Sequence, residues 1–219
     1  MMFTSFPSRE HAGRELALRL KSMGIADPVI LALPRGGVPI AAEVARVLHA
    51  PLDLLLVRKI GVPSMPELAA AAIVDGEKPD LVLNTGVMEA AGLTAADIYS
   101  LADEQLAEIE RRRKFYLADR KPVSVEDKTA IVIDDGVATG TTAKAALQAL
   151  RRRSPKAIIL ATPVGSTEAL SDLGPFADQV VCLQQPPLFS AIGQFYSDFH
   201  QLTDAEVIEA LGASDLPHA

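Results

Sequence analysis

The most informative stretch in this chain of 219 residues is Ala130-Ile131-Val132-Ile133-Asp134-Asp135-Gly136-Val137-Ala138-Thr139-Gly140-Thr141-Thr142. Apolar residues lead directly into two adjacent carboxylates, and a loop of small residues, glycines and threonines follows them. Sequence with helical character then continues from residue 143 to residue 153. This order predicts a buried strand that ends in two acids, a short loop and a helix.

The loop in this stretch has the composition of a phosphate site. Backbone N–H groups and hydroxyls can surround one phosphate, and a helix N-terminus favours an anion. Asp134 and Asp135 repel phosphate, but they suit sugar hydroxyls and hydrated magnesium. The segment therefore offers partners for a phosphate, a diol and a metal, which are the needs of a ribose 5-phosphate.

Other interpretations of the same loop fit less well. An ordinary strand-to-helix turn capped by Asp or Thr is the simplest alternative, but such a cap does not need two carboxylates and two glycines. A Walker A loop requires Gly-Lys-Ser/Thr, whereas Gly140 is followed by Thr141. The chain also has no G-x-G-x-x-G pattern after a strand, so a dinucleotide fingerprint is not supported.

The acid-pair loop closely resembles the motif with which type I phosphoribosyltransferases bind phosphoribosyl pyrophosphate (PRPP). The resemblance implies that Asp134 and Asp135 face the ribose hydroxyls. It implies that PRPP is bound by Gly136, Val137, Ala138, Thr139, Gly140, Thr141 and Thr142, of which residues 138–142 surround the 5′-phosphate. It also implies Mg²⁺ as cofactor, with Asp134 and Asp135 holding the ion indirectly, through water or ribose hydroxyls.

Composition limits the remaining classes of function. About 49% of the residues are apolar, enough for the core of one large domain, 1–219. The net charge of −7 argues against a general nucleic-acid coat. The single cysteine, Cys182, fits a reducing cytoplasm, and neither a signal peptide nor a membrane span is expected. A cytoplasmic protein is therefore predicted; a homodimer is compatible with the sequence, which does not settle the oligomeric state.

Strand-like and helix-like segments alternate along the chain, which predicts an α/β fold: a parallel five-stranded core sheet flanked by helices. The expected strands are 28–33, 52–57, 129–133, 156–162 and 179–183. A small hood is expected from about 1–25 and 186–219, and an insertion dominated by one long helix at about 85–117. Capping boxes begin the long helix (Thr94, Asp97) and the last helix (Thr203, Glu206). The cations Arg111 to Lys114 are interpreted as a solvated helix end in preference to a phosphate site.

A second motif, Leu33-Pro34-Arg35-Gly36-Gly37, ends the first strand. Arg35 places a cation at the carboxyl edge of the sheet, and the paired glycines let backbone N–H groups approach a ligand. The resemblance makes Arg35, Gly36 and Gly37 the pyrophosphate loop, which in that family often contains a non-proline cis peptide; the matching bond here is Arg35–Gly36. A glycine-rich turn with an exposed arginine is the alternative.

A third motif is Val57-Arg58-Lys59, interpreted as the end of the second strand. The stretch from Ile60 to Glu67 is rich in Gly, Pro and Ser, which indicates a mobile loop. By resemblance this loop closes over PRPP, and Lys59 or Arg58 neutralises the leaving pyrophosphate. The alternative is a solvated strand end, and the role of Glu67 is left open between proton transfer and capping.

Aromatic residues gather in the late segment 189–199 of a chain that has few. Phe195 or Tyr196 could stack on a base, and Asp198 could bind an amino group. A hydrophobic cluster that holds the tail on the core explains the segment equally well.

Over residues 8–212 the chain most resembles a poorly characterised bacterial group of predicted phosphoribosyltransferases. The shared features are 34–38, 57–59, 66–69, the acid-pair loop and 193–199. Hypoxanthine–guanine enzymes of the wider family carry an acid where this chain has Ala138, which counts against a 6-oxopurine enzyme of that type.

The expected function is phosphoribosyl transfer from PRPP to a nitrogenous base, or its reverse, giving a nucleoside 5′-monophosphate and pyrophosphate. The expected catalytic residues are Lys59, Arg58, Arg35, Asp134 and Asp135. The main alternative is a non-catalytic regulator that senses PRPP or nucleotides. A phosphatase or kinase is less favoured, because the chain lacks a Walker loop and a clear nucleophile. The acceptor is not determined by the sequence.

Overall fold

The computed structural model describes residues 5–76, 79–118 and 120–213. The chain divides into two compact units. The first comprises Met1–Leu54 and Val123–Ala219, and the second comprises Leu55–Pro122. The ends of the expected hood, residues 1–4 and 214–219, lie outside the described residues.

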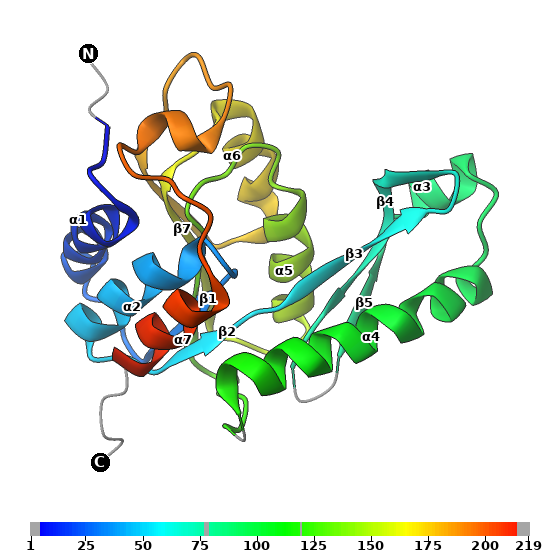
Figure 1. Cartoon of the computed structure of the whole chain (residues 1–219), viewed down its shortest axis with the longest axis horizontal. Coiled ribbons are helices and arrows are strands. Elements are labelled where there is room, and N and C mark those ends of the chain that lie inside the picture. The colour runs from blue at the N-terminus through cyan, green and yellow to red at the C-terminus, as the bar shows by residue number, and fades with distance from the viewer. Residues whose placement is uncertain (1–4, 77–78, 119, 214–219) are drawn as a thin grey trace. The chain divides into compact units, whose positions relative to one another are not determined.

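The first unit is built on a five-stranded parallel sheet (Figure 1), as predicted. Its strand order is β2-β1-β6-β7-β8. The strands are β1 (Pro28–Ala32), β2 (Leu52–Leu54), β6 (Thr129–Ile133), β7 (Ala157–Val164) and β8 (Gln179–Gln184). All five expected strands are present because each is an apolar run that can be buried on both faces of a parallel sheet.

Strands β1 and β6 lie side by side in a register that decides where the site forms. Pro28 pairs with Thr129, and Ala32 pairs with Ile133. The N–H of Leu33 then donates to the carbonyl of Ile133 at 2.9 Å. The two strands therefore end at the same level, and the loops that follow them begin next to each other.

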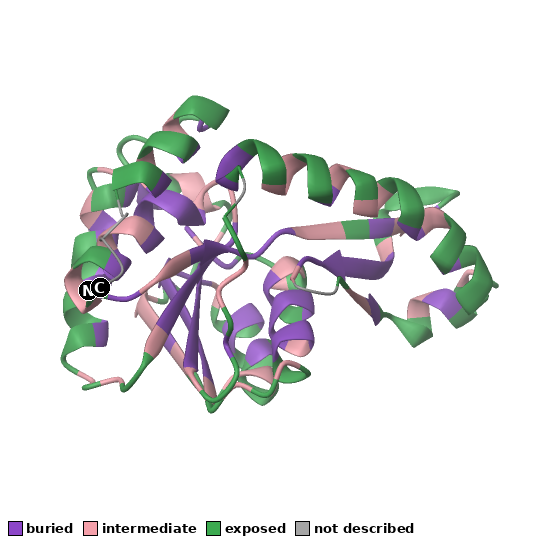
Figure 2. Ribbon diagram, turned by 90° about the horizontal axis from the view of Figure 1, so that it is seen from below, coloured by how far each residue is buried: buried purple, intermediate pink, exposed green. Residues whose placement is uncertain are grey.

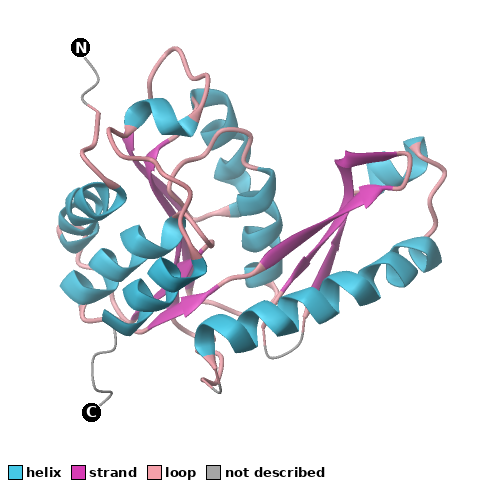
Figure 3. Ribbon diagram, viewed as in Figure 1, coloured by secondary structure: helices cyan, strands magenta, loops and turns pink. Residues whose placement is uncertain are grey.

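Helices cover both faces of this sheet. Helices α1 (Arg9–Lys21) and α2 (Gly37–Leu48) lie on one face, and α5 (Thr141–Arg151) lies on the other (Figures 1 and 3). All five residues of β6 are buried between these layers (Figure 2). A Cβ at Gly13 of α1 would lie 2.9 Å from the Cα of Ile40, so α1 and α2 pack at close range.

The remaining elements of the first unit follow β7 and β8. They are α6 (Thr167–Leu173), the 3₁₀ turns η1 (Gly174–Phe176) and η2 (Ile192–Phe195), and α7 (Asp204–Ala213). The tail returns to the N-terminal segment, where the N–H of Phe6 donates to the carbonyl of Phe195 at 2.8 Å. The N–H of Ser197 in turn donates to the carbonyl of Phe6 at 2.8 Å. The N-terminal segment and the tail, both assigned to the hood, are thus joined to each other.

The second unit is a three-stranded antiparallel sheet with two helices. Its order is β3-β4-β5. The elements are β3 (Val57–Val62), β4 (Met65–Val74), β5 (Asp80–Leu83), α3 (Thr85–Ala90) and α4 (Ala95–Leu117). The predicted capping box of the long helix is present, with Asp97 N–H donating to Thr94 Oγ1 at 3.3 Å and Thr94 N–H donating to Asp97 Oδ2 at 2.8 Å. Helix α4 buries Ile98, Ile109 and Tyr116.

Two predictions for this region were wrong. The second core strand ends at Leu54, and Arg58 and Lys59 lie in β3 of the second unit. The stretch 60–67, expected to be a mobile loop, forms parts of β3 and β4, with the turn confined to Pro63 and Ser64. Pro63 and Ser64 form the hairpin turn, and Gly61 lies at a bulge. The rest of the stretch is extended because β3 pairs with the alanine-rich β4.

The insertion is consequently larger than predicted. It was expected at about 85–117, dominated by one long helix, whereas the second unit begins at Leu55 and includes a sheet. The cations at the end of α4 are paired in part within this unit: Arg111 and Arg112 bind Glu108, and Arg113 Nη1 lies 2.6 Å from Asp75 Oδ2. Among the described residues, none of the helices combines the length and the apolar character that crossing a bilayer requires.

Candidate functional site

The acid-pair loop follows β6 and is tied to the neighbouring chain at several points. The N–H of Val137 donates to the carbonyl of Val164 at 2.9 Å, and the N–H of Ser166 donates to the carbonyl of Val137 at 2.9 Å. Ser166 Oγ donates to the carbonyl of Ala138 at 2.9 Å. The loop is therefore held in one path between β6 and α5.

A cavity of about 170 Å³ lies in this loop. It is lined by Asp134, by residues 136–143 and by Ile192. A water molecule occupies about 30 Å³ in the liquid, so the cavity has room for an anion of phosphate size. The predicted phosphate-loop residues thus line one cavity, and Asp134 is the acid on its wall.

The start of α5 leaves backbone donors beside this cavity. The N-cap is Gly140, in the left-handed region at φ 71°, and no side chain caps the helix. By contrast, α1, α4 and α6 are capped by the hydroxyls of Ser8, Thr94 and Ser166. The first N–H groups of a helix have no partner within the helix, so those of α5 are suited to an anion.

The two adjacent acids have different surroundings. Asp134 is half-buried and lines the cavity, whereas Asp135 is buried and is absent from the cavity wall. Asp135 Oδ2 accepts a hydrogen bond from Arg9 Nε at 2.9 Å. Burial, together with the neighbouring Asp135 carboxylate, raises the pKa of Asp134. Burial also raises the pKa of Asp135, and the Arg9 guanidinium opposes that shift.

The second predicted motif lies directly against the first. A Cβ at Gly37 would lie 2.5 Å from the carbonyl oxygen of Ile133, and a Cβ at Gly36 would overlap the carboxylate of Asp135. Arg35 Nη1 lies 3.8 Å from Asp204 Oδ1 of α7, and both side chains are partly exposed. The structure therefore brings Arg35, Gly36 and Gly37 to the acid pair, although the two motifs are about 100 residues apart in the sequence.

The cis peptide bond in this loop is placed differently from the prediction. It lies at Pro34–Arg35, one residue before the expected Arg35–Gly36 bond. Gly36 already has right-handed helical dihedrals, φ −60° and ψ −35°, at the N-cap of α2. The irregular bond thus precedes the residue at which the helical conformation begins.

The third motif belongs to the second unit. Arg58 Nε donates to Gln105 Oε1 at 3.1 Å, and Lys59 is exposed on β3. Glu67 is exposed on β4. The assignment of Arg58 and Lys59 to the leaving pyrophosphate stays a prediction.

The aromatic residues of the tail form a cluster on the first unit. Phe195 and Tyr196 are buried with Phe6, Ala12 and Val164, and Leu183, Phe189, Ile192 and Phe199 pack against them. The Tyr196 ring lies 5.1 Å from that of Phe199, stacked, and 5.6 Å from that of Phe6. The aromatic residues therefore form the hydrophobic cluster that holds the tail on the core. Contact of Phe195 or Tyr196 with a base stays a prediction.

Two polar side chains of the tail also have partners within the chain. Tyr196 Oη donates to the backbone carbonyl of Asp135 at 2.6 Å. Asp198 Oδ1 lies 2.8 Å from His200 Nδ1, and His200 Nε2 lies 2.8 Å from Glu206 Oε1. The expected capping box of Thr203 and Glu206 is present at the start of α7. The tail thus reaches the acid pair through the Tyr196 phenol.

Sequence reasoning missed two residues of the site, and the more important of them is Arg9. A single arginine at the start of an amphipathic helix has the sequence pattern of a solvated charge. Its partner Asp135 is 126 positions away, and only the packing of α1 on the sheet brings the two together. Ile192 on the cavity wall was also missed, because it gave no polar signal.

The residues around the cavity offer few ligands for the magnesium that the resemblance implies. Among the described residues, no group of three or more His, Cys, Asp and Glu side chains could hold a metal ion. Asp135 is already paired with Arg9, which leaves Asp134 as the carboxylate on the cavity wall. Magnesium prefers about six oxygens and commonly takes several from water and substrate phosphates. The residues therefore fit an ion held mainly by a substrate.

Comparison with known proteins gives a consistent result. A model of the phosphoribosyl transferase domain family matches residues 2–199. A protein of Mycobacterium tuberculosis, provisionally named a phosphoribosyl transferase, is 45% identical over 206 residues, which cover 94% of this chain and 46% of the relative. This chain thus spans about half the length of that relative.

Solved structures agree with the fold. The crystal structure of the protein TT1426 from Thermus thermophilus is 37% identical and has a TM-score of 0.83 over 95% of this chain and 98% of that one. A Neisseria gonorrhoeae protein, crystallised with bound ppGpp, has a TM-score of 0.51 at 11% identity, over 98% of this chain and 97% of that one. At that identity the second likeness concerns the fold alone.

Proposed function

This chain belongs to the phosphoribosyl transferase domain family, and we propose that it transfers the phosphoribosyl group of PRPP to a nitrogenous base. The products are a nucleoside 5′-monophosphate and pyrophosphate, and the same site can run the reverse reaction. The observation that carries the proposal is the cavity lined by Asp134 and residues 136–143 at the uncapped start of α5.

The cavity would take the 5′-phosphate. Its donors are backbone N–H groups at the start of α5 and the hydroxyls of Thr139 and Thr141, whose oxygens lie 3.3 Å apart. The helix N-terminus adds favourable electrostatics for an anion. With the phosphate held there, the ribose lies toward Asp134 at the carboxyl end of β6.

The chemistry then depends on charge placed around the ribose. Glycosyl transfer passes through a species that resembles an oxocarbenium ion, so a carboxylate near the ring stabilises positive charge as it develops. Asp134 supplies that carboxylate. Arg35, with the backbone of Gly36 and Gly37, would bind the departing pyrophosphate. No protein nucleophile is needed, because positioning and electrostatics lower the barrier.

Magnesium, when bound with PRPP, would supply positive charge to the pyrophosphate, and Asp134 is the carboxylate of the cavity wall that would help to hold it. The ionised form of Asp134 is the one that binds hydroxyls and cations. Because burial and Asp135 raise the pKa of Asp134, PRPP binding should weaken as the pH falls through that raised value.

Release of pyrophosphate from PRPP across a panel of nitrogenous bases, with Mg²⁺ present, tests the proposal. The wild-type protein should release pyrophosphate with at least one base, and Asp134→Asn should not. Asp103→Asn, which removes the same charge from an exposed position on α4, is the matched control and should behave as wild type. Binding of PRPP without turnover on any base would favour the regulator, and absence of binding would overturn the proposal.

A further inference from the structure

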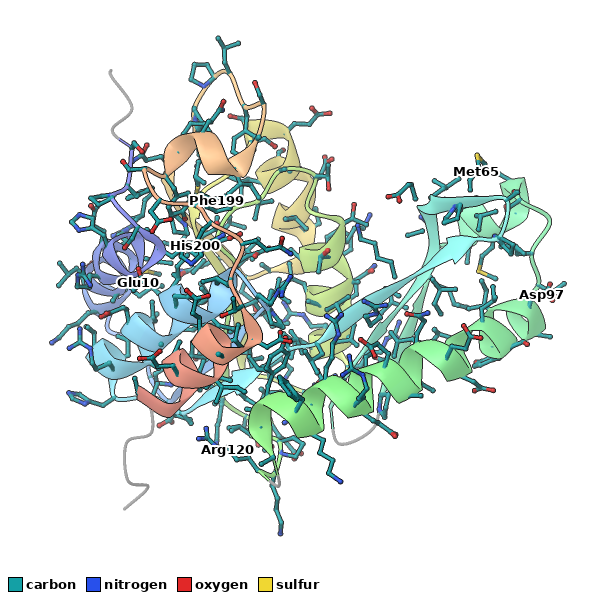
Figure 4. All side chains as sticks on the ribbon, viewed as in Figure 1. Glu10, Met65, Asp97, Arg120, Phe199 and His200 are labelled. Atoms are coloured by element: carbon teal, nitrogen blue, oxygen red, sulfur yellow. The ribbon has the colours of Figure 1, made fainter. Side chains whose placement is uncertain are left out.

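Arg9 is a buried cation of α1 that is not among the residues assigned by the PRPP motif. It is 6% exposed. Its Nε donates to Asp135 Oδ2 at 2.9 Å, and its Nη1 donates to the carbonyl of His200 at 3.0 Å. Its guanidinium carbon lies 3.9 Å from the centre of the Phe199 ring, and Figure 4 labels Phe199 and His200 in the tail. The side chain therefore has a defined place between α1, the tail and the acid pair.

Asp135 is confined from the other directions as well. Its backbone carbonyl accepts from the Tyr196 phenol at 2.6 Å. Its carboxylate occupies the space in which any side chain at position 36 would lie. Only 11% of its side chain is exposed, and it does not line the phosphate cavity. A carboxylate held in this way points at Arg9 and not at a ligand in the cavity.

We propose that Arg9 is a positioning residue that holds Asp135 in a buried ion pair, so that Asp134 is the only one of the two acids that meets the ligand. The identity of that ligand as PRPP rests on the function proposed above. The two acids of the motif therefore have different tasks. Asp134 binds the ligand, and Asp135 joins the acid-pair loop to α1 and the tail through Arg9 and Tyr196.

Charge explains why such a pair is useful here. PRPP is a polyanion, and two uncompensated carboxylates beside its site would repel it. Arg9 offsets one of the two charges without entering the cavity. Arginine suits this task, because its planar fork bonds the carboxylate and the His200 carbonyl at once while its face covers Phe199. Lysine has a single point charge and cannot make all three contacts.

Calorimetric titration of PRPP in the presence of Mg²⁺ tests whether Asp134, and not Asp135, meets the ligand. Asp134→Asn should weaken PRPP binding at least about tenfold more than Asp135→Asn does, because only the former removes a charge-assisted bond to the ligand. Arg9→Met should weaken binding about tenfold or more, since it leaves a second unpaired carboxylate. Adding Asp135→Asn to Arg9→Met should recover most of that loss. Equal losses from the two aspartate variants, or no recovery in the double variant, would overturn the proposal.

Thermal unfolding without ligand tests the pairing itself. Arg9→Met should lower the melting temperature by roughly 10 °C, as expected for a buried ion pair broken on one side. Arg9→Lys should lie between it and wild type, and the combined Arg9→Met and Asp135→Asn changes should be less damaging than the sum of the two. Arg14→Met, on the exposed side of α1, is the matched control and should shift the temperature little.

The two measurements separate the possible failures. If the wild-type protein does not bind PRPP, the proposed function fails, and the thermal cycle still decides whether Arg9 and Asp135 are coupled. If PRPP binds but the thermal cycle shows additive effects, the role of Arg9 is wrong while the proposed function stands. If Arg9→Met does not fold, Arg9→Lys with and without Asp135→Asn carries the same comparison.

Discussion

Replacement of Gly36 by alanine tests how tightly the two motifs are packed together. Gly36 has φ −60° and ψ −35°, a conformation that alanine adopts without strain. The added Cβ would nevertheless overlap Oδ2 and Cγ of Asp135 and lie 2.9 Å from Oδ1. The cost of the substitution is therefore steric and not conformational.

The size of the effect follows from what must move. Asp135 cannot turn aside freely, because Arg9 binds its carboxylate and Tyr196 binds its carbonyl. Overpacking costs about 1–3 kcal/mol, and separating a buried ion pair costs about 3–5 kcal/mol. Alanine also reduces the conformational entropy of the unfolded chain, which stabilises the folded protein by about 0.4–1 kcal/mol. We expect Gly36→Ala to lower the free energy of unfolding by roughly 1 kcal/mol if the ion pair stays closed and by up to roughly 7 kcal/mol if it opens fully.

Urea unfolding followed by circular dichroism at 25 °C measures this change, with an unaltered slope m as the sign that only stability has changed. Gly212→Ala on α7 is the control, since no atom lies within 4 Å of the added Cβ, and it should be neutral or slightly stabilising. In an Asp135→Ala background the same Gly36→Ala change should cost much less. A Gly36→Ala protein as stable as wild type, or an equal cost in both backgrounds, would refute the close packing.

Three further predictions concern the loop, the second unit and the tail. Gly140→Ala should raise the dissociation constant for inorganic phosphate, measured by calorimetry, because φ 71° and the nearby Leu173 disfavour a Cβ at the start of α5; unchanged affinity would argue against a phosphate site there. Lys59→Ala should lower kcat about 10²–10³-fold with little effect on KM if Lys59 meets the leaving group, and a change in KM alone would make it a ground-state ligand. The hydrogen bonds that the His200 ring donates to Asp198, and then to Glu206, raise the pKa of His200, so its stabilising contribution is complete below its unfolded pKa of about 6.5 and is lost as pH rises through the folded value. His200→Gln should therefore flatten the fall in melting temperature between mildly acidic and mildly alkaline pH, and an unchanged profile would contradict this.

Local patterns carried most of the fold prediction. Each core strand is an apolar run, and each capping box is a pair of residues three positions apart, so both can be recognised within a short window. The prediction failed at residues 60–67, where glycine, proline and serine suggested a loop. There the strand exists because it pairs with β4, and such pairing does not show in the composition of one segment.

The five core strands and the chemistry of the acid-pair loop could be predicted from the sequence, because both depend on residues that are neighbours in the chain. Which of the two acids faces the cavity depends on the packing of the folded chain. The two carboxylates are adjacent and chemically identical, and they differ because β6 directs Asp134 toward the phosphate loop while α1 brings Arg9 to Asp135. A contact across 126 positions is decided by how helices pack on a sheet, so the division of tasks between the acids appears only in the folded chain.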